Sequence, residues 1–315
     1  MESGEPTTKR DGRTGIIGSG ALGSYFGIRL ASAGWPVAFL LRSDFEAVRQ
    51  GGFVLELSDG TEQRLEKPEI YRGTAEMGRL DWILIALKTT HNHLLPEMLR
   101  PLVGRETRLV TLQNGLGNVA FLEEHFPKTP VLGGLCQIGV NREAPGRIRS
   151  FVPEDGFVQL GAGLRATTAD LDEVQARLES AGIRVKRAPS LGEALWRKLM
   201  WNVPFNGLTV ALGGVGTHRV CENDELRAVA HHLMEEIRTA ANALGYPIEA
   251  EYTDKLLGFT DRLGDYKASS VLDWKAGRPL EVDAIFRKPL HAGQAAGVPM
   301  PHLATLCALL AGLRG

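Results

Sequence analysis

Apolar runs of strand length alternate with stretches of helical periodicity over the first part of the chain. The run Gly15-Ile16-Ile17 is followed by a helical stretch that continues from Ser24 to Ala33, and the next apolar run covers residues 37–41. Residues 81–87 form a strongly apolar run of the kind found in a parallel strand covered on both faces. This alternation predicts an α/β fold with a doubly wound parallel sheet.

Other elements of this part are predicted from shorter patterns. Two further apolar runs cover residues 109–112 and 131–135, and a last strand at 183–188 follows an amphipathic helix at 169–181. Alternation at residues 53–57 followed by Asp59-Gly60 indicates a hairpin. Residues 146–161 are predicted to be hairpin strands, with turns at Pro145-Gly146 and Asp155-Gly156.

The pattern changes near Pro189, and helical periodicity dominates after it. Helices are predicted at residues 193–203, 223–244, 249–263, 281–297 and 301–313. Pro204 removes a helical N–H and crowds the carbonyl of Met200, so a kink or break is expected there, with Asn206-Gly207 in a turn. We therefore expect three parts: a disordered leader at 1–13, a Rossmann-type NADP-binding domain at 14–189 and an all-helical substrate and catalytic domain at 190–315. The 315 residues suffice for two cores.

A glycine-rich turn follows the first predicted strand and opens the first helix. Its sequence is Gly18-Ser19-Gly20-Ala21-Leu22-Gly23. Gly18 permits a tight turn, Gly20 lets the backbone approach a pyrophosphate, and Gly23 lets the helix lie close to its strand. Unpaired N–H groups and the helix dipole favour an anion at this point. The spacing alone is common, but its strand-to-helix setting predicts a dinucleotide site.

The residues after the second strand indicate which dinucleotide binds. A ribose 2′-hydroxyl is usually held there by an acidic residue, whereas a 2′-phosphate needs a cation. The chain has Leu40-Leu41-Arg42-Ser43 at this point, so Arg42 is predicted to pair with a 2′-phosphate, and NADPH is favoured over NADH and FAD. The alternative is that Arg42 is a solvated surface residue, and the nearby Asp44 and Glu46 would weaken the preference.

Composition excludes several classes of partner. The chain carries 36 basic and 37 acidic residues, a net charge of −1 and no basic block, which argues against nucleic acid and anionic membranes. Its apolar runs are far shorter than the roughly 20 residues of a membrane span, and three scattered cysteines fit a reducing cytoplasm. Neither His91-Asn92-His93 nor His231-His232 has further ligands at metal-site spacing, so no metal is expected.

A polar row opens the helical part. Lys198, Asn202 and Asn206 are spaced by four residues, which keeps them near one face of a helix. Reduction of a ketone builds negative charge on the carbonyl oxygen, so a proton donor or cation is needed there, and Lys198 is a candidate. The spacing alone fits a solvated lysine and two helix-capping asparagines equally well.

Further motifs follow the glycine turn and Arg42 in order. They are Ala86-Leu87-Lys88-Thr89, Leu112-Gln113-Asn114-Gly115-Leu116-Gly117, Trp196-Arg197-Lys198 with Asn202 and Asn206, Ala268-Ser269-Ser270-Val271-Leu272-Asp273, and Gly277-Arg278-Pro279 leading into Glu281-Val282-Asp283. In this order, across both predicted domains, the motifs resemble the ketopantoate reductases (2-dehydropantoate 2-reductases). The resemblance covers nearly all of the chain after Thr14.

The resemblance implies NADPH-dependent reduction of 2-dehydropantoate to (R)-pantoate, a step towards pantothenate and coenzyme A. By matching positions, it implies that Lys198 is the general acid and that Glu281 binds the substrate hydroxyl and helps hold Lys198. It also implies that Asn202, Asn206 and Ser269 bind polar groups of pantoate, and that Lys88, Asn114 and Glu281 lie beside the cofactor and the substrate. The remaining cofactor residues would be Gly18, Ser19, Gly20, Ala21, Leu22, Gly23 and Arg42.

Departures from the family pattern leave room for a related substrate. Ser270 replaces the usual methionine, and Pro204 lies inside the signature helix. One alternative is therefore an NADP-dependent reductase of another branched 2-oxo acid. A second is a non-enzymatic NADP(H)-binding sensor, although a sensor needs no proton donor such as Lys198. A homodimer formed through apolar faces of the C-terminal helices is compatible with the sequence.

Overall fold

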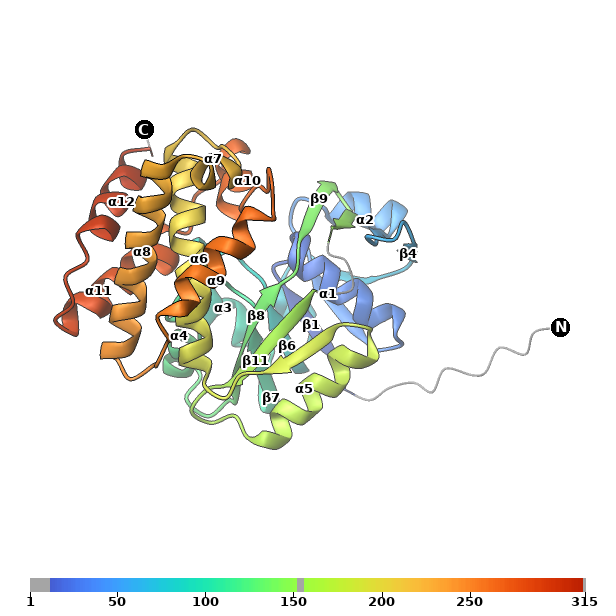
Figure 1. Ribbon diagram of the computed structural model, residues 1–315. Helices are drawn as coiled ribbons and strands as arrows, with labels where there is room; N and C mark the ends of the chain where they lie inside the picture. Colours follow the sequence, from blue (N-terminus) through green and yellow to red (C-terminus); the bar gives the residue numbers. More distant parts are fainter. Residues whose placement is uncertain (1–11, 152–155, 314–315) are drawn as a thin grey trace. The chain divides into compact units, whose positions relative to one another are not determined.

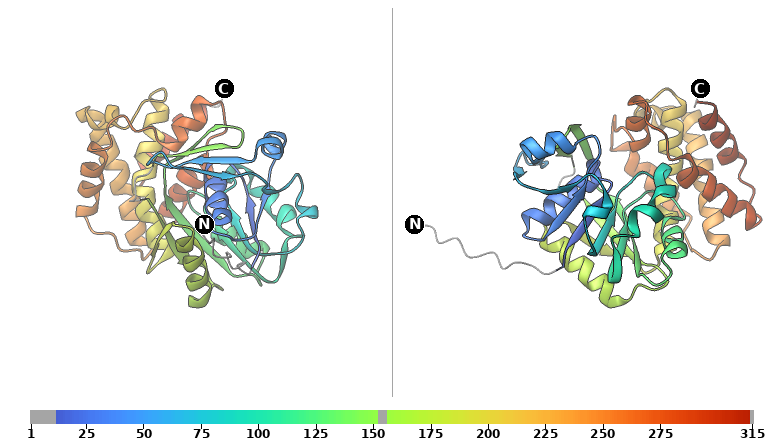
Figure 2. Two further views of the ribbon diagram at one scale, coloured as in Figure 1. Left: turned by 90° about the vertical axis from the view of Figure 1, so that its right-hand side faces the viewer. Right: turned by 180° about the vertical axis from the view of Figure 1, so that it is seen from behind.

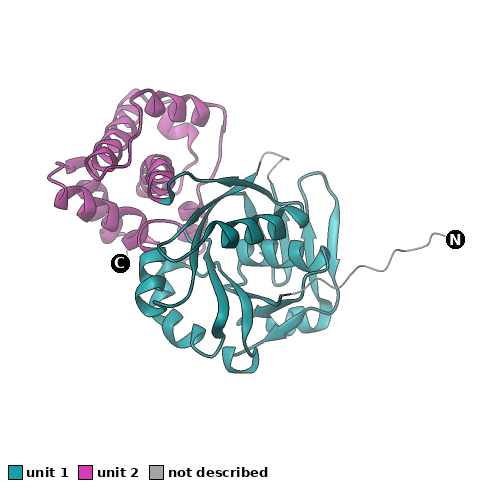
Figure 3. Cartoon of the chain, turned by 90° about the horizontal axis from the view of Figure 1, so that it is seen from below, with its two compact units in different colours: residues 1–113, 119–191 teal, residues 114–118, 192–315 magenta. Residues whose placement is uncertain are grey.

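The chain divides into two compact units, which Figure 3 draws in different colours. This computed structural model describes residues 12–151 and 156–313. The first unit comprises residues 1–113 and 119–191, and the second comprises residues 114–118 and 192–315. The predicted leader, apart from its last two residues, and Asp155 of one predicted turn lie outside the described residues. The disorder of the leader stays a prediction.

An eight-stranded sheet forms the centre of the first unit (Figure 1). Its strand order is β12-β11-β8-β7-β6-β1-β2-β5, and all neighbours are parallel except β8 and β11. This mixed but mainly parallel sheet confirms the predicted fold class. The strands are β1 (Thr14–Ile17), β2 (Val37–Leu40), β5 (Glu69–Tyr71), β6 (Leu80–Ile85), β7 (Val103–Thr111), β8 (Val131–Gln137), β11 (Phe157–Ala162) and β12 (Arg184–Arg187).

Helices cover both faces of this sheet because both faces are apolar. On β6, Trp82 and Leu84 belong to one core cluster, and Ile83 and Ile85 belong to another, as alternation along a strand requires. The first cluster includes buried side chains of α1 (Ala21–Ser32) and α5 (Thr168–Ser180). The second includes buried side chains of α3 (Leu95–Leu99) and α4 (Asn118–His125). The shorter helices of the unit are α2 (Phe45–Gly51), η1 (Thr74–Glu76) and η2 (Thr89–Leu94).

A smaller sheet of order β4-β3-β10-β9 packs on α1 (Figure 2). Its strands are β3 (Phe53–Glu56), β4 (Glu62–Leu65), β9 (Val140–Ala144) and β10 (Arg147–Ser150). The predicted hairpin at Asp59-Gly60 and the turn at Pro145-Gly146 are confirmed, since both strand pairs are antiparallel. The hairpin predicted within residues 146–161 is wrong. β10 pairs with β3 and β9, whereas β11 joins the large sheet, where Val158 and Leu160 are fully buried.

The second unit is helical. Its elements are α6 (Leu191–Ala211), α7 (His218–Cys221), α8 (Asp224–Ala243), α9 (Glu251–Asp261), α10 (Ser269–Lys275), the π-helical η3 (Asp283–Arg287), α11 (Lys288–Ala295) and α12 (Pro301–Gly312). The helix predicted over 281–297 is therefore two segments of different pitch. The short helices α7 and α10 are additional, because a window of one or two turns carries little periodicity.

The break predicted at Pro204 is wrong. α6 runs without interruption through Pro204, so Asn206 and Gly207 are helical. Every residue from Asn202 to Val210 is buried, and Val203 and Phe205 belong to the core cluster of the unit. Tertiary packing therefore outweighs the one hydrogen bond that the proline removes, because most helical stability in proteins comes from packing.

Candidate active site

The glycine turn joins β1 to α1 with the tight geometry that the motif predicts. Gly18 has a φ of +95°, a region that favours glycine, and a Cβ there would overlap the backbone of Ala86 and Leu87. A Cβ on Gly23 would overlap the carbonyl oxygen of Gly18. Both positions thus need glycine for close backbone approach within the first unit.

Gly20 and Ser19 fit a bound pyrophosphate. A Cβ on Gly20 would meet nothing within 4 Å, so the space beside the N-terminus of α1 is open. The buried Oγ of Ser19 has no hydrogen-bond partner among the described residues. An open space beside an unpaired hydroxyl, at the positive end of a 12-residue helix, suits a phosphate. The residues present therefore fit the dinucleotide that the motif predicts.

Arg42 follows β2 and remains available for an anion. It is exposed, and within the described part of the chain it forms no hydrogen bond or ion pair. The two neighbouring carboxylates have arginine partners of their own. Asp44 lies 2.7 Å from Nη1 of Arg142, and Glu46 accepts a hydrogen bond from Nε of Arg49 at 2.9 Å. Neither acid is paired with Arg42. The structure therefore shows no direct contact through which Asp44 or Glu46 would weaken the preference for NADPH.

Lys88 leaves the sheet one strand away from the glycine turn. It lies between β6 and η2, and β6 is the parallel neighbour of β1. The next strand, β7, leads to Gln113, whose Nε2 donates to the Leu87 carbonyl oxygen and to Oδ1 of Asn92, both at 2.7 Å. Oγ1 of Thr111 completes this network by donating to Oε1 of Gln113 at 3.0 Å. Because parallel strands end at one edge, Lys88 and Gln113 lie at the same edge of the sheet as the glycine turn.

Gln113 has a structural role that its motif in the sequence does not predict. It is 9% exposed, and its amide holds the residue before Lys88 and the helix after it. The signal available in the sequence was its place directly after a buried strand. Spacing could not reveal it, because its partners lie 21 and 26 residues away.

Lys198 has a defined partner within the second unit. Its Nζ donates a hydrogen bond to Oδ1 of Asn114 at 2.8 Å, across 84 residues of sequence. Asn114 begins the five-residue segment 114–118 that belongs to the helical unit. This segment is held to η3 by a hydrogen bond of 2.9 Å from the N–H of Leu116 to the carbonyl oxygen of Ala284. The structure thus joins two predicted site residues, and Lys198 is not a freely solvated side chain.

Asn202 and Asn206 lie in the buried part of α6, at 6% and 2% exposure. Oδ1 of Asn206 accepts hydrogen bonds from the N–H of Ser270 at 3.0 Å and from Oγ of Ser269 at 3.3 Å. Asn206 of α6 therefore caps the N-terminus of α10. Ser269 is the first residue of α10, and Ala268 stands at the N-cap position. Among the described residues, the side chain of Asn202 and Nδ2 of Asn206 have no hydrogen-bond partner.

Glu281 is 5% exposed and lies just before η3. Its carbonyl oxygen accepts the N–H of Ile285 at 3.1 Å, which places it at the entry to that helix. The structure therefore provides a buried carboxyl group in the same unit as Lys198. Its predicted contact with Lys198 stays a prediction.

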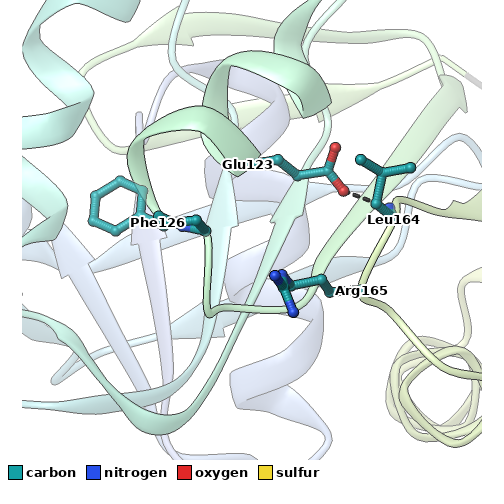
Figure 4. Close-up of a pocket in the computed structure, with 5 residues that line it drawn as sticks. Glu123, Phe126, Leu164 and Arg165 are labelled. Atoms are coloured by element: carbon teal, nitrogen blue, oxygen red, sulfur yellow. Dashed lines mark hydrogen bonds between the residues drawn. The ribbon is translucent and has the colours of Figure 1, made fainter.

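Other features of the described residues contribute nothing to this site. No described helix is long and apolar enough to cross a membrane, and no three His, Cys, Asp or Glu residues of the described ranges are placed to hold a metal ion. A surface pocket of about 180 Å³ is lined by Glu123, Phe126, Pro127, Leu164 and Arg165 (Figure 4). It lies where α4 leads into β8 and β11 ends, which is the opposite edge of the sheet from the glycine turn.

The fold and the glycine turn define the class of protein: a Rossmann-type dinucleotide-binding protein with a helical second unit. Comparisons with known proteins identify its family. The family described as "Ketopantoate reductase PanE/ApbA" matches residues 14–164, and its C-terminal counterpart matches residues 191–314. The chain belongs to the ketopantoate reductase family. It is thus an NADPH-dependent oxidoreductase that reduces ketopantoate.

Individual relatives agree with this family over almost their whole length. The chain is 35% identical to a 2-dehydropantoate 2-reductase of Nostoc, with 91% of each chain covered. The crystal structure of 2-dehydropantoate 2-reductase from Geobacter metallireducens has a TM-score of 0.91 at 37% identity, covering 95% of this chain and 99% of that one. The enzyme from Methylococcus capsulatus has a TM-score of 0.87 at 30% identity, with 96% of each chain covered.

Proposed function

We propose that Lys198 is the general acid in the reduction of 2-dehydropantoate to (R)-pantoate. Bound NADPH supplies the hydride. The ketone oxygen then gains negative charge, and the Lys198 ammonium donates a hydrogen bond and finally a proton to it. The observation that carries this proposal is the 2.8 Å hydrogen bond from Nζ of Lys198 to Oδ1 of Asn114, since it directs the ammonium to a defined point.

Four further polar residues of the second unit are proposed to bind the substrate: Asn202, Asn206, Ser269 and Glu281. Asn202 is buried without a partner among the described residues, so its amide is available to a hydroxyl or carboxylate. Asn206 uses Oδ1 to cap α10 and keeps Nδ2 for a substrate oxygen. Ser269 and Glu281 are assigned to the substrate hydroxyl groups, with Glu281 also holding Lys198.

The first unit is proposed to bind the cofactor. Residues 18–23 hold the pyrophosphate and Arg42 binds the 2′-phosphate. Lys88 of this unit is assigned to the nicotinamide ribose and the substrate, as is Asn114, which belongs to the second unit. The support comes from the open space at Gly20, and from the Oγ of Ser19 and the guanidinium of Arg42, neither of which has a partner in the part of the chain that the structure describes. We place the reaction in the synthesis of pantothenate and coenzyme A.

A panel of branched 2-oxo acids, each assayed with NADPH and with NADH, tests this proposal. We expect the highest kcat/KM for ketopantoate with NADPH. A second branched 2-oxo acid is a specific candidate because Ser270 replaces the family's usual methionine. A higher kcat/KM for another branched 2-oxo acid than for ketopantoate would identify that acid as the preferred substrate. NADPH binding without turnover of any acid would contradict an enzymatic role.

We further propose that the enzyme works in the cytoplasm as a homodimer. None of Cys136, Cys221 and Cys307 forms a disulfide within the described ranges, as a reducing compartment favours. A structural relative from Staphylococcus aureus is named a dimeric ketopantoate reductase, and at 19% identity it shares the fold. Sedimentation at several protein concentrations would distinguish a dimer from a monomer.

A further inference from the structure

Two arginines leave the large sheet side by side next to the glycine turn. β2 and β5 are parallel neighbours, and Leu40 is in register with Tyr71. The N–H of Leu41 donates to the Tyr71 carbonyl oxygen at 2.9 Å, which continues the pairing past both strands. The residues that follow this pairing are Arg42 and Arg72. Both guanidinium groups therefore start from the same edge of the sheet.

Arg72 is held in place by contacts on α2. Its guanidinium carbon lies 4.0 Å from the centre of the Phe45 ring, and Nη2 forms an ion pair with Oε1 of Glu46. The other oxygen of Glu46 is bound by Arg49, at 2.8 Å from Nη2. These contacts orient Arg72, yet its side chain remains 56% exposed. The guanidinium is thus positioned by its neighbours and still accessible to a ligand.

Charge at this corner exceeds what the neighbouring acids neutralise. Three arginines (Arg49, Arg72 and Arg142) are paired with the two carboxylates Asp44 and Glu46, and Arg42, which follows β2 beside them in sequence, forms no ion pair within the described residues. Hydrogen bonds from Arg49 and Arg72 lower the pKa of Glu46, so this carboxyl is ionised at neutral pH. An uncompensated positive charge remains, of the size that a phosphate dianion would balance.

We propose that Arg72 is a second determinant of NADPH specificity, which binds the adenosine 2′-phosphate together with Arg42. Phe45 fixes the plane of the guanidinium, and Arg72 turns part of its hydrogen bonding from Glu46 to the phosphate. NADH has a hydroxyl at this position and gains little from a second cation. The proposal rests on the cofactor site assigned to the first unit under the proposed function.

The test compares Arg72→Ala with Arg49→Ala in the full-length enzyme. Both arginines are about equally exposed and both bind Glu46, but only Arg72 contacts Phe45 and follows β5. We expect Arg72→Ala to lower kcat/KM for NADPH about tenfold and to change kcat/KM for NADH less than about twofold. Arg49→Ala should change the ratio of the two by less than about twofold, and Arg72→Lys should fall between Arg72→Ala and the wild type.

Inhibition by 2′-AMP and 5′-AMP provides a readout that does not depend on turnover of NADPH. Arg72→Ala should weaken inhibition by 2′-AMP about tenfold and leave inhibition by 5′-AMP unchanged. Equal losses for both nucleotides, or equal losses in Arg72→Ala and Arg49→Ala, would overturn the role of Arg72. A wild-type enzyme with no preference for NADPH would instead overturn the 2′-phosphate site itself, and this proposal with it.

Discussion

The glycine turn of the first unit and the polar row of the second are built in opposite ways. The turn uses backbone groups from six consecutive residues, and its constraints are a φ of +95° at Gly18 and close backbone contacts at Gly18 and Gly23. The polar row uses side chains of α6 whose partners, Asn114 and Ser270, lie 84 and 64 residues away in the sequence. One site is encoded locally, and the other exists only in the folded unit.

This difference predicts different consequences of mutation. In a locally encoded backbone site, an added side-chain atom acts through steric overlap. An atom that overlaps the backbone lowers stability and ligand binding together, whereas an atom that enters open space interferes with ligand binding alone. In a site of buried side chains, loss of one group leaves its partner without a hydrogen bond, which costs stability as well as function. The following substitutions test these expectations.

Replacing Gly18 should have the largest effect. In Gly18→Val, the φ of +95° and the overlap with Ala86 and Leu87 should remove NADPH binding and lower the free energy of unfolding by more than about 3 kcal/mol. Cofactor titration and denaturant unfolding measure the two effects.

Gly20→Ala is the matched control, because its methyl group would enter open space. We expect unchanged stability but NADPH binding weakened by about tenfold or more, since the methyl group would occupy the place of the pyrophosphate. Full NADPH affinity in Gly20→Ala would contradict the assignment of that space.

Arg42→Ala tests whether a single side chain in the first unit selects the cofactor. Loss of a charge-assisted hydrogen bond to a 2′-phosphate should raise KM for NADPH by about 10- to 100-fold and leave KM for NADH within about twofold. Steady-state kinetics with both cofactors measure the ratio. Equal changes for NADPH and NADH would refute the 2′-phosphate role of Arg42.

Substitutions of Asn206 test whether this side chain both caps α10 and binds the substrate. Asn206→Ala removes the cap of α10 and should cost about 1–2 kcal/mol of stability as well as raising KM for ketopantoate. Asn206→Asp keeps an oxygen for the N–H of Ser270 but loses Nδ2, so stability should recover while KM stays high. A normal KM in Asn206→Asp would show that Nδ2 does not bind the substrate.

The smallest effect on stability is expected from loss of the ion pair between Glu249 and Arg197, the residue next to Lys198. Its hydrogen bond to Glu249, at 2.7 Å, lowers the pKa of Glu249 from 4.5 to about 2. Because the folded-state pKa is depressed, the stabilisation is present above about pH 4.5 and is lost as the pH falls towards 2. Glu249 is 43% exposed, so solvent screening limits the contribution to below about 1 kcal/mol.

Denaturant unfolding of Glu249→Gln at several pH values measures this contribution. The variant should be slightly less stable than the wild type at pH 7, and the difference should shrink as the pH falls below 4. A difference that stays constant over this range would exclude the ion pair as its cause. Glu251→Gln is the control, since Glu251 forms no ion pair among the described residues.

The sequence predicted the fold class and the glycine turn because both rest on local patterns. Strand β6 is legible as an apolar run, and Gly18, Gly20 and Gly23 follow β1 directly. The break predicted at Pro204 is absent because the packing around Val203 and Phe205, which keeps α6 continuous, involves residues distant in sequence. The partners of Lys198 and Asn206 and the network of Gln113 were not predictable for the same reason, since a single sequence does not record which distant residues meet.

The most direct test of the account is a single-turnover measurement of NADPH oxidation by Lys198→Ala with saturating ketopantoate. If the ammonium of Lys198 protonates the ketone oxygen, the rate should fall by about 100-fold or more, while the dissociation constant for NADPH stays within about threefold of the wild type. A rate within about tenfold of the wild type would show that the proton comes from another group, and the central claim would be wrong.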